Sequence, residues 1–141
     1  MSKIAIVYWS GTGNTEVMAN AVMDGIQDAG SDCSLFTASE FTPDRLNEFD
    51  AFAFGCPSMG VESLEDSEFE PMFQACEPLL TGKKLALFGS FGWGDGEWMR
   101  NWEDACRTDG AELVCDSVIC CEAPDGEAVE KCRRLGAALC E

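Results

Sequence analysis

The chain carries the stretch Val7-Tyr8-Trp9-Ser10-Gly11-Thr12-Gly13-Asn14-Thr15, in which an apolar strand pattern passes into a helix pattern. The loop between the two patterns consists of glycines and hydroxyl residues. Gly11 and Gly13 can adopt positive φ angles, which point successive backbone N–H groups into one concavity. The hydroxyls of Ser10, Thr12 and Thr15 add donors, and the following helix brings its unpaired N–H groups and positive dipole end to the same point. The loop is therefore predicted to bind a phosphate group.

The residues that are absent from this loop indicate which kind of phosphate group it would bind. It contains no Lys, Arg or His, so dipoles alone would hold the anion. It is not a Walker loop, because no Gly-Lys-Ser/Thr follows, and it is not the dinucleotide motif G-x-G-x-x-G, because Glu16 replaces the third glycine. A single phosphate monoester is the better prediction. An ordinary strand-to-helix turn rich in capping residues is the alternative.

The composition bounds the size of the protein and its partners. The 141 residues, 46% of them hydrophobic, suit one domain spanning 1–141 with a full core. The 26 acidic and 9 basic residues give a net charge of −17, which disfavours nucleic acid and anionic membranes and favours basic protein partners, unless the charge serves solubility alone. No apolar run approaches the roughly 20 residues of a membrane span, and the start Met1-Ser2-Lys3 does not resemble a signal peptide. We therefore expect a cytoplasmic protein without membrane insertion.

The cysteines and the absence of histidine limit the chemistry. No C-x-x-C spacing occurs among the nine cysteines, their number is odd, and most lie within apolar patterns, so structural thiols are predicted rather than disulfides or an iron–sulfur site. Cys120 and Cys121 are adjacent in a predicted strand and must point to opposite faces, so at least one can approach a site. The absence of His excludes Ser-His and Cys-His nucleophiles and His metal sites. Any chemistry would be carried by a cofactor.

Apolar runs alternate with helical patterns along the whole chain, which is typical of a doubly wound parallel sheet. Five strands are predicted, at residues 3–8, 34–37, 51–55, 84–90 and 112–120. Helices are predicted at residues 14–28, 67–76, 97–108 and 125–140, with a short helical turn at 43–47. In the first helix, Val17, Met18, Ala21, Val22 and Ile26 have the spacing of core residues.

The loops after the first, third and fourth strands should converge on one site, because ligands of parallel sheets bind beyond the carboxyl ends of the strands. The third strand leads into Gly55-Cys56-Pro57-Ser58-Met59-Gly60-Val61-Glu62, and the fourth ends in Gly89-Ser90-Phe91-Gly92-Trp93-Gly94-Asp95-Gly96. Trp93, flanked by glycines, suits stacking on a flat ring, and the polarizable Met59 could cover its opposite face. A flat heteroaromatic ring with one phosphate describes FMN.

These motifs together resemble the flavodoxins, specifically the short-chain, clostridial-like type of anaerobic bacteria. The resemblance rests on residues 8–16, on Ser67-Glu68-Phe69-Glu70-Pro71 and on residues 87–96, and the run 112–121 lacks the insertion of long-chain members. It implies an α/β three-layer sandwich with a five-stranded parallel sheet of order 2-1-3-4-5.

The resemblance also implies the cofactor site. The phosphate ligands would be Ser10, Gly11, Thr12, Gly13, Asn14 and Thr15. Met59 and Trp93 would cover the FMN ring, the carbonyl of Gly60 would meet flavin N5–H after one-electron reduction, and Glu62 would lie near N3–H. The remaining residues expected around the ring and ribityl chain are Ser58, Val61, Ser90, Phe91, Gly92, Gly94 and Glu122. No catalytic residue and no metal site are implied.

The function that the resemblance implies is low-potential electron transfer, one electron at a time, by non-covalently bound FMN that alternates between neutral semiquinone and anionic hydroquinone. The protein would be a monomer acting between redox proteins with basic docking surfaces, steered by an acidic face that contains Glu62, Glu65, Asp66 and Glu68. Two alternatives remain at this point. One is a small FMN-dependent NAD(P)H reductase, and the other is an FMN-binding module without a redox role.

Overall fold

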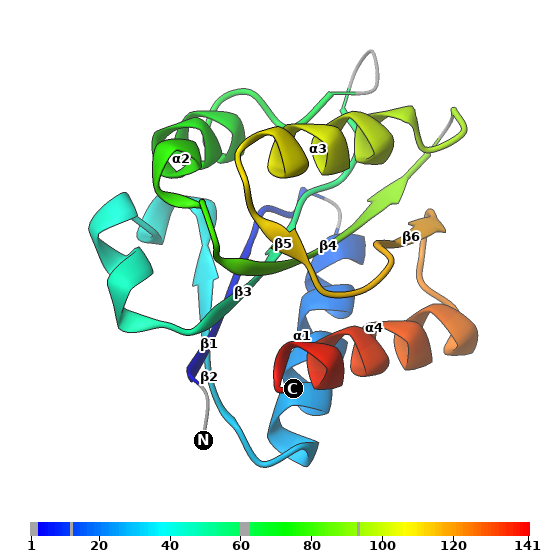
Figure 1. The fold of residues 1–141 in the computed structure, drawn as a ribbon. Helices are drawn as coiled ribbons and strands as arrows, with labels where there is room; N and C mark the ends of the chain where they lie inside the picture. The colour runs from blue at the N-terminus through cyan, green and yellow to red at the C-terminus, as the bar shows by residue number, and fades with distance from the viewer. Residues whose placement is uncertain (1–2, 12, 60–62, 93) are drawn as a thin grey trace.

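The computed structural model describes residues 3–11, 13–59, 63–92 and 94–141 of the chain (Figure 1). Its strands are β1 (Lys3–Tyr8), β2 (Asp32–Thr37), β3 (Ala51–Gly55), β4 (Lys84–Phe91), β5 (Glu112–Leu113) and β6 (Val118–Cys121). All pairings are parallel, in the order β2-β1-β3-β4-β5, and β6 also pairs with β4. The predicted order 2-1-3-4-5 is confirmed, with β5 and β6 together occupying the fifth position.

The helices cover both faces of this sheet. The α-helices are α1 (Asn14–Asp28), α2 (Phe69–Cys76), α3 (Glu97–Thr108) and α4 (Gly126–Leu139), and the 3₁₀ turns are η1 (Ala38–Glu40), η2 (Pro43–Glu48) and η3 (Glu77–Leu79). Helices α1 and α4 lie on one face of the sheet, and α2 and α3 lie on the other (Figure 1). This is the predicted three-layer sandwich. No described helix is long and apolar enough to cross a bilayer.

The two helical layers bury two separate cores. Along β1, Ile4 and Ile6 pack into the core under α1 and α4, while Ala5 and Val7 pack into the core under α2 and α3. A strand that is buried on both faces must be apolar at every position, which is why β1 lacks the alternation of a half-exposed strand. In α1 the core stripe is Met18, Val22 and Ile26, whereas Val17, which we predicted in the core, is 47% exposed.

The fifth strand was predicted as one continuous segment at residues 112–120, but the structure divides it into β5 and β6. Leu85 of β4 pairs with Leu113, and Phe88 pairs with Val118. Two residues of β4 thus lie opposite four residues, 114–117, of the last strand. Two residues of this segment therefore have no partner on β4, and the interruption splits the strand into β5 and β6.

Candidate functional site

A cavity of about 290 Å³ lies at the carboxyl ends of the central strands. It receives residues from the loops after β1, β3 and β4 and from the turn after β6, as expected for the switch point of a doubly wound sheet. Its lining consists of Trp9, Ser10, Gly11, Asn14, Thr15, Pro57, Ser58, Met59, Ser90, Phe91, Gly92 and Glu122. The three loops that the sequence predicted to converge do meet here.

One end of the cavity has the properties of an anion site. Gly13, which precedes α1, has φ 96°, the left-handed conformation predicted for it. The Ser10 Oγ accepts the N–H groups of Gly13 at 3.1 Å and Glu16 at 3.3 Å, so its own O–H stays available as a donor. The N–H groups of Asn14 and Thr15 have no acceptor in the described part of the chain. This end therefore offers unpaired donors at a helix N-terminus, which fits a phosphate.

Gly11 serves this loop for a different reason from the one predicted. It does not adopt a left-handed φ; instead, a Cβ at this position would lie 2.9 Å from the Cη2 atom of Trp9. The Trp9 indole is held in place by the bond from its Nε1 to Glu68 Oε1, at 2.9 Å. Glycine is thus favoured here because any larger residue would force the Trp9 ring to shift, and this close contact is not visible in a motif.

A short network fixes the relative positions of the three loops. The hydroxyls of Thr15 and Ser90 lie 3.1 Å apart, and both residues are buried. The Ser58 N–H donates to the Ser90 carbonyl at 2.9 Å, and the Trp98 indole N–H donates to the Cys56 carbonyl at 3.2 Å. Side chains and backbone groups of α1, β4 and the loop after β3 are therefore bound to one another directly around the cavity.

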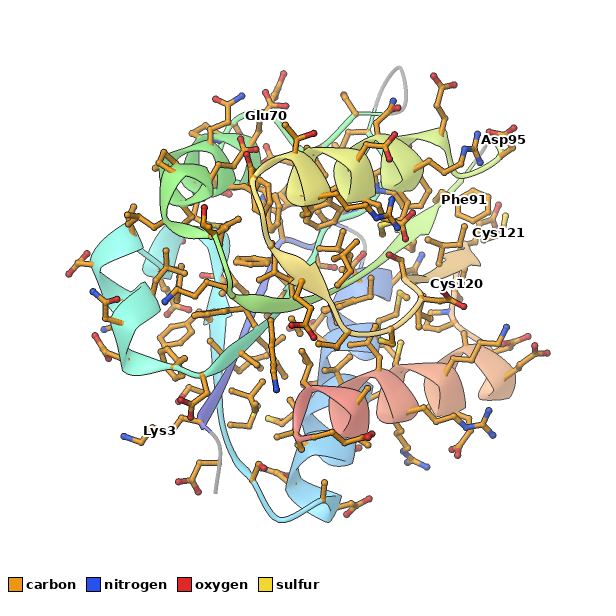
Figure 2. The ribbon with its side chains drawn as sticks, in the orientation of Figure 1. Lys3, Glu70, Phe91, Asp95, Cys120 and Cys121 are labelled. Atoms are coloured by element: carbon orange, nitrogen blue, oxygen red, sulfur yellow. The ribbon has the colours of Figure 1, made fainter. Side chains whose placement is uncertain are left out.

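The far end of the cavity is formed by Met59, Phe91, Gly92 and Glu122. Met59 is 36% exposed, and its backbone exchanges two hydrogen bonds with Ser63. Glu122 has φ 59°, which is unusual for a residue other than glycine, and its N–H donates to the Phe91 carbonyl at 2.7 Å. Phe91 lies beside Cys121, its pairing partner, at the edge where β4 and β6 end (Figure 2).

Some predicted site residues are absent from this lining. Thr12, Gly60, Val61, Glu62 and Trp93 lie outside the described residues. Gly13 lines a neighbouring hollow on the other side of Trp9, and Gly94, with φ 88°, is not part of the cavity wall. The turn Asp95–Gly96 after it is fastened by a 3.0 Å ion pair between Arg100 and Asp95.

The comparisons with known proteins agree with this geometry. The model of the flavodoxin family matches residues 6–136. The chain belongs to the flavodoxin family. It is 45% identical over 131 residues to a flavodoxin of Clostridium beijerinckii (93% of this chain, 94% of the relative), and 43% identical over 135 residues to one of Megasphaera elsdenii (96% of each).

Solved structures of other flavodoxins have the same fold as this chain. The solution structure of two-electron reduced Megasphaera elsdenii flavodoxin superposes with a TM-score of 0.89 at 43% identity, over 96% of this chain and 97% of that one. A flavodoxin from the domain Archaea superposes at 0.84 with 27% identity, over 97% and 95% of the two chains. As a flavodoxin of the short-chain clostridial and Megasphaera kind, the protein is an FMN-containing electron carrier and not an enzyme.

One residue of the predicted acidic face of this flavodoxin has another role. Glu65 is 4% exposed, and its carboxylate accepts the N–H groups of Glu68 at 2.8 Å, Phe69 at 2.9 Å and Ser67 at 2.9 Å, as well as the Ser67 hydroxyl. Glu65 therefore caps the start of α2 instead of facing a partner, and α2 begins at Phe69 rather than at residue 67. Asp66 and Glu68 are exposed, as expected.

We expect Glu65→Ala to lower the free energy of unfolding by about 2 kcal/mol, because it leaves several donors at the α2 N-terminus unpaired. Burial raises the pKa of Glu65, but the hydrogen bonds from Ser67, Phe69 and Glu68 outweigh it, so the net pKa is lowered from 4.5. The stabilisation is therefore present above pH 4.5 and disappears as the pH falls through the lowered value. Urea unfolding between pH 3 and pH 7 measures the effect. The exposed Asp66→Ala is the matched control, and an equal loss in both variants would contradict the capping role.

The cysteines behave largely as predicted. Cys56, Cys76, Cys106 and Cys132 are buried, and burial is the first cause that raises their thiol pKa values to between about 11 and about 12. Cys120 turns inward, with its sulfur 3.6 Å from the Met18 sulfur, whereas Cys121 is exposed. The two side chains thus point to opposite faces, and neither belongs to the cavity lining.

Proposed function

We propose that this flavodoxin holds the FMN phosphate on the loop from Ser10 to Thr15 and the FMN ring at the end of the cavity near Met59, and that it passes single electrons between redox proteins with basic surfaces. The observation that supports the site most strongly is the pair of unpaired N–H groups of Asn14 and Thr15 at one end of a cavity with apolar walls at the other. The second ring cover, Trp93, enters this proposal on sequence alone.

The chain's own residues bind and orient the cofactor, and FMN, when bound, supplies the redox chemistry. The helix dipole of α1, the N–H groups of Asn14 and Thr15, and the hydroxyls of Ser10 and Thr15 would neutralise the phosphate without a basic side chain. Glu122 at the rim and the absence of Lys and Arg from the described lining disfavour added negative charge on the ring. This setting supports a low reduction potential.

The alternative of an NAD(P)H reductase is less well supported. A second nucleotide would need donors or cationic groups for its phosphates beside the flavin ring. The described residues of the cavity wall include Met59, Phe91 and Gly92 at the ring end, but neither Lys nor Arg. A carrier needs no such group, because its flavin edge exchanges electrons with another protein directly.

The proposal also covers the domain organisation, the oligomeric state, the cell compartment and the partners of the protein. We infer one FMN-binding domain over residues 1–141, a monomer, in the cytoplasm. The nine cysteines are free thiols, which suits a reducing compartment. The net charge of −17 supports basic rather than nucleic-acid or membrane partners.

We expect electron transfer from the reduced protein to a basic haem protein to slow by about tenfold or more as the salt concentration rises from 10 mM to 1 M. The physical reason is screening, since the Debye length falls from about 30 Å to about 3 Å over that range. Stopped-flow measurement of the second-order rate constant tests this, with an uncharged quinone as the control oxidant. A rate constant with the basic acceptor that does not change with salt would contradict charge-steered docking.

A further inference from the structure

A second cavity, of about 300 Å³, lies between α2 and α3. Its floor is aromatic and buried, formed by Phe73, Trp98 and Trp102. Its rim carries hydrogen-bond acceptors, the carboxylates of Glu70 and Glu77 and the amides of Gln74 and Asn101. None of the described residues that line it is basic. Glu70 lies on the outer surface of α2 (Figure 2).

The floor of this groove contains an unsatisfied donor. Trp102 is 3% exposed, and its indole N–H has no acceptor within the described structure. The ring itself is fixed by edge-to-face packing on Phe69 and Phe73, with centroids 5.4 and 5.6 Å away. A buried N–H without a partner costs about 1–3 kcal/mol. The Trp102 N–H is closed to solvent, so a ligand carbonyl would reach it, and remove this cost, once the side chains above it move apart.

The rim of the groove also contains a carboxyl group whose pKa is raised. Glu77 has a pKa raised to about 7, first by burial, then by a hydrogen bond with Asp109 and by the charges of Asp109 and Glu70. The neighbouring Cys106 is a neutral thiol, because burial and the charges of Asp109, Glu77 and Glu103 raise its pKa to about 12. Asp109 Oδ2 is buried without a donor among the described groups, so a proton on Glu77 would give it a partner. A cation that reaches Glu77 can therefore replace this proton.

We propose that the groove between α2 and α3 receives an arginine side chain of a redox partner, with the guanidinium on Glu70 and Glu77 and a neighbouring backbone carbonyl of the partner on the Trp102 N–H. A guanidinium is planar, weakly hydrated and rich in donors, so it suits an aromatic floor with an acceptor rim better than an ammonium does. The inference rests on the proposed docking of basic redox proteins and assigns a site to it.

The groove is also connected to the flavin cavity through the backbone. Ser63 and Leu64 line the groove, and Ser63 exchanges two hydrogen bonds with Met59, at 2.8 and 3.0 Å. Met59 lines the cavity that we assign to FMN. A partner anchored in the groove would thus lie beside Ser63, which is bonded to Met59 at the border of the flavin cavity, as short-range electron transfer requires.

The test uses the FMN-loaded protein and the probe Nα-acetyl-arginine methylamide, with its uncharged citrulline analogue as the ligand control. Binding is followed by the indole N–H resonance of Trp102, which is assigned by its loss in Trp102→Phe. We expect the arginine probe to shift this resonance and to bind about tenfold more tightly at pH 8 than at pH 6, because the deprotonated fraction of Glu77 rises about tenfold around a pKa of about 7. The citrulline analogue should bind at least several-fold more weakly.

Three variants distinguish binding of the arginine probe in the groove from nonspecific attraction of a cation to an acidic protein. Glu77→Gln should weaken binding and abolish its pH dependence, while its amide can still donate to Asp109 and preserve the fold. Trp102→Phe lacks the indole resonance, so its affinity and that of the unsubstituted protein are compared by calorimetric titration; it should bind more weakly but keep the pH dependence. The exposed Asp24→Asn on α1 should change nothing beyond a small general charge effect. If the Trp102 resonance did not shift, or if Glu77→Gln and Asp24→Asn lost equal affinity for the probe, the proposed arginine site would be wrong. Because FMN affinity and salt-dependent electron transfer are measured separately, either result would leave the carrier function standing.

Discussion

FMN is expected to bind at least about 1,000-fold more tightly than riboflavin, which lacks the phosphate. Three hydrogen bonds from the α1 loop to a charged phosphate, at about 1.5 kcal/mol each at the low end, sum to about 4.5 kcal/mol, and this corresponds to a factor above 1,000. Titrations of the apoprotein, followed by flavin fluorescence, measure both affinities. Equal affinities would contradict the assignment of the loop at Ser10 to Thr15 to the phosphate.

A single hydroxyl should account for a defined share of this difference. Thr15→Val keeps the volume of a side chain that is 1% exposed and removes its hydroxyl, so FMN affinity should fall by about 1.5–3 kcal/mol while riboflavin affinity stays the same. The exposed Thr108→Val on α3 is the control. If Thr15→Val weakened riboflavin as much as FMN, the hydroxyl would act through its bond to Ser90 and not through the phosphate.

Gly136→Ala is expected to lower the free energy of unfolding by about 2 kcal/mol. Helices α1 and α4 approach each other at backbone distance, and a Cβ on Gly136 would lie 2.3 Å from the Val22 carbonyl oxygen. Overpacking of this kind costs up to about 3 kcal/mol, and the better helix propensity of alanine offsets about 1 kcal/mol of it. Urea unfolding at a fixed, saturating FMN concentration measures the net change.

The matched control lies on the same helix. A Cβ on Gly126, at the start of α4, would meet nothing within 4 Å, so Gly126→Ala should leave stability unchanged or raise it slightly. Equal destabilisation by both substitutions would show that glycine matters in α4 for a reason other than close contact with α1.

Most of the fold could be predicted because its signals are local. β1, β3, α1 and α3 have the bounds that apolar runs and helical spacing predicted. The split of the last strand could not be predicted, because it depends on a register in which two residues of β4 oppose four residues of its partner. Nor could the glycine contacts between α1 and α4, since Gly25 meets the Arg133 backbone and Gly136 meets the Val22 backbone only after both helices pack on the sheet.

The site also has features that the sequence predicted and features that it did not. The convergence of three loops follows from the strand order, so the sequence predicted it. The roles of Glu65 and Gly11 depend on where α2 starts and where the Trp9 ring lies, and neither is a property of a short motif. The α2–α3 groove was also missed, because its residues are ordinary helix positions until the two helices are side by side. The sequence shows Glu77 and Asp109 as acidic residues. It does not show that they interact, because they come together only in the folded chain.

Anaerobic photoreduction of the FMN-loaded protein, followed by absorbance and repeated with NADH or NADPH in place of light, tests the carrier function most directly. We predict two separate one-electron steps with an accumulating blue form between them, and no bleaching of the flavin by either nicotinamide. Rapid oxidation of NADH or NADPH with turnover of the flavin would contradict the account and identify a reductase.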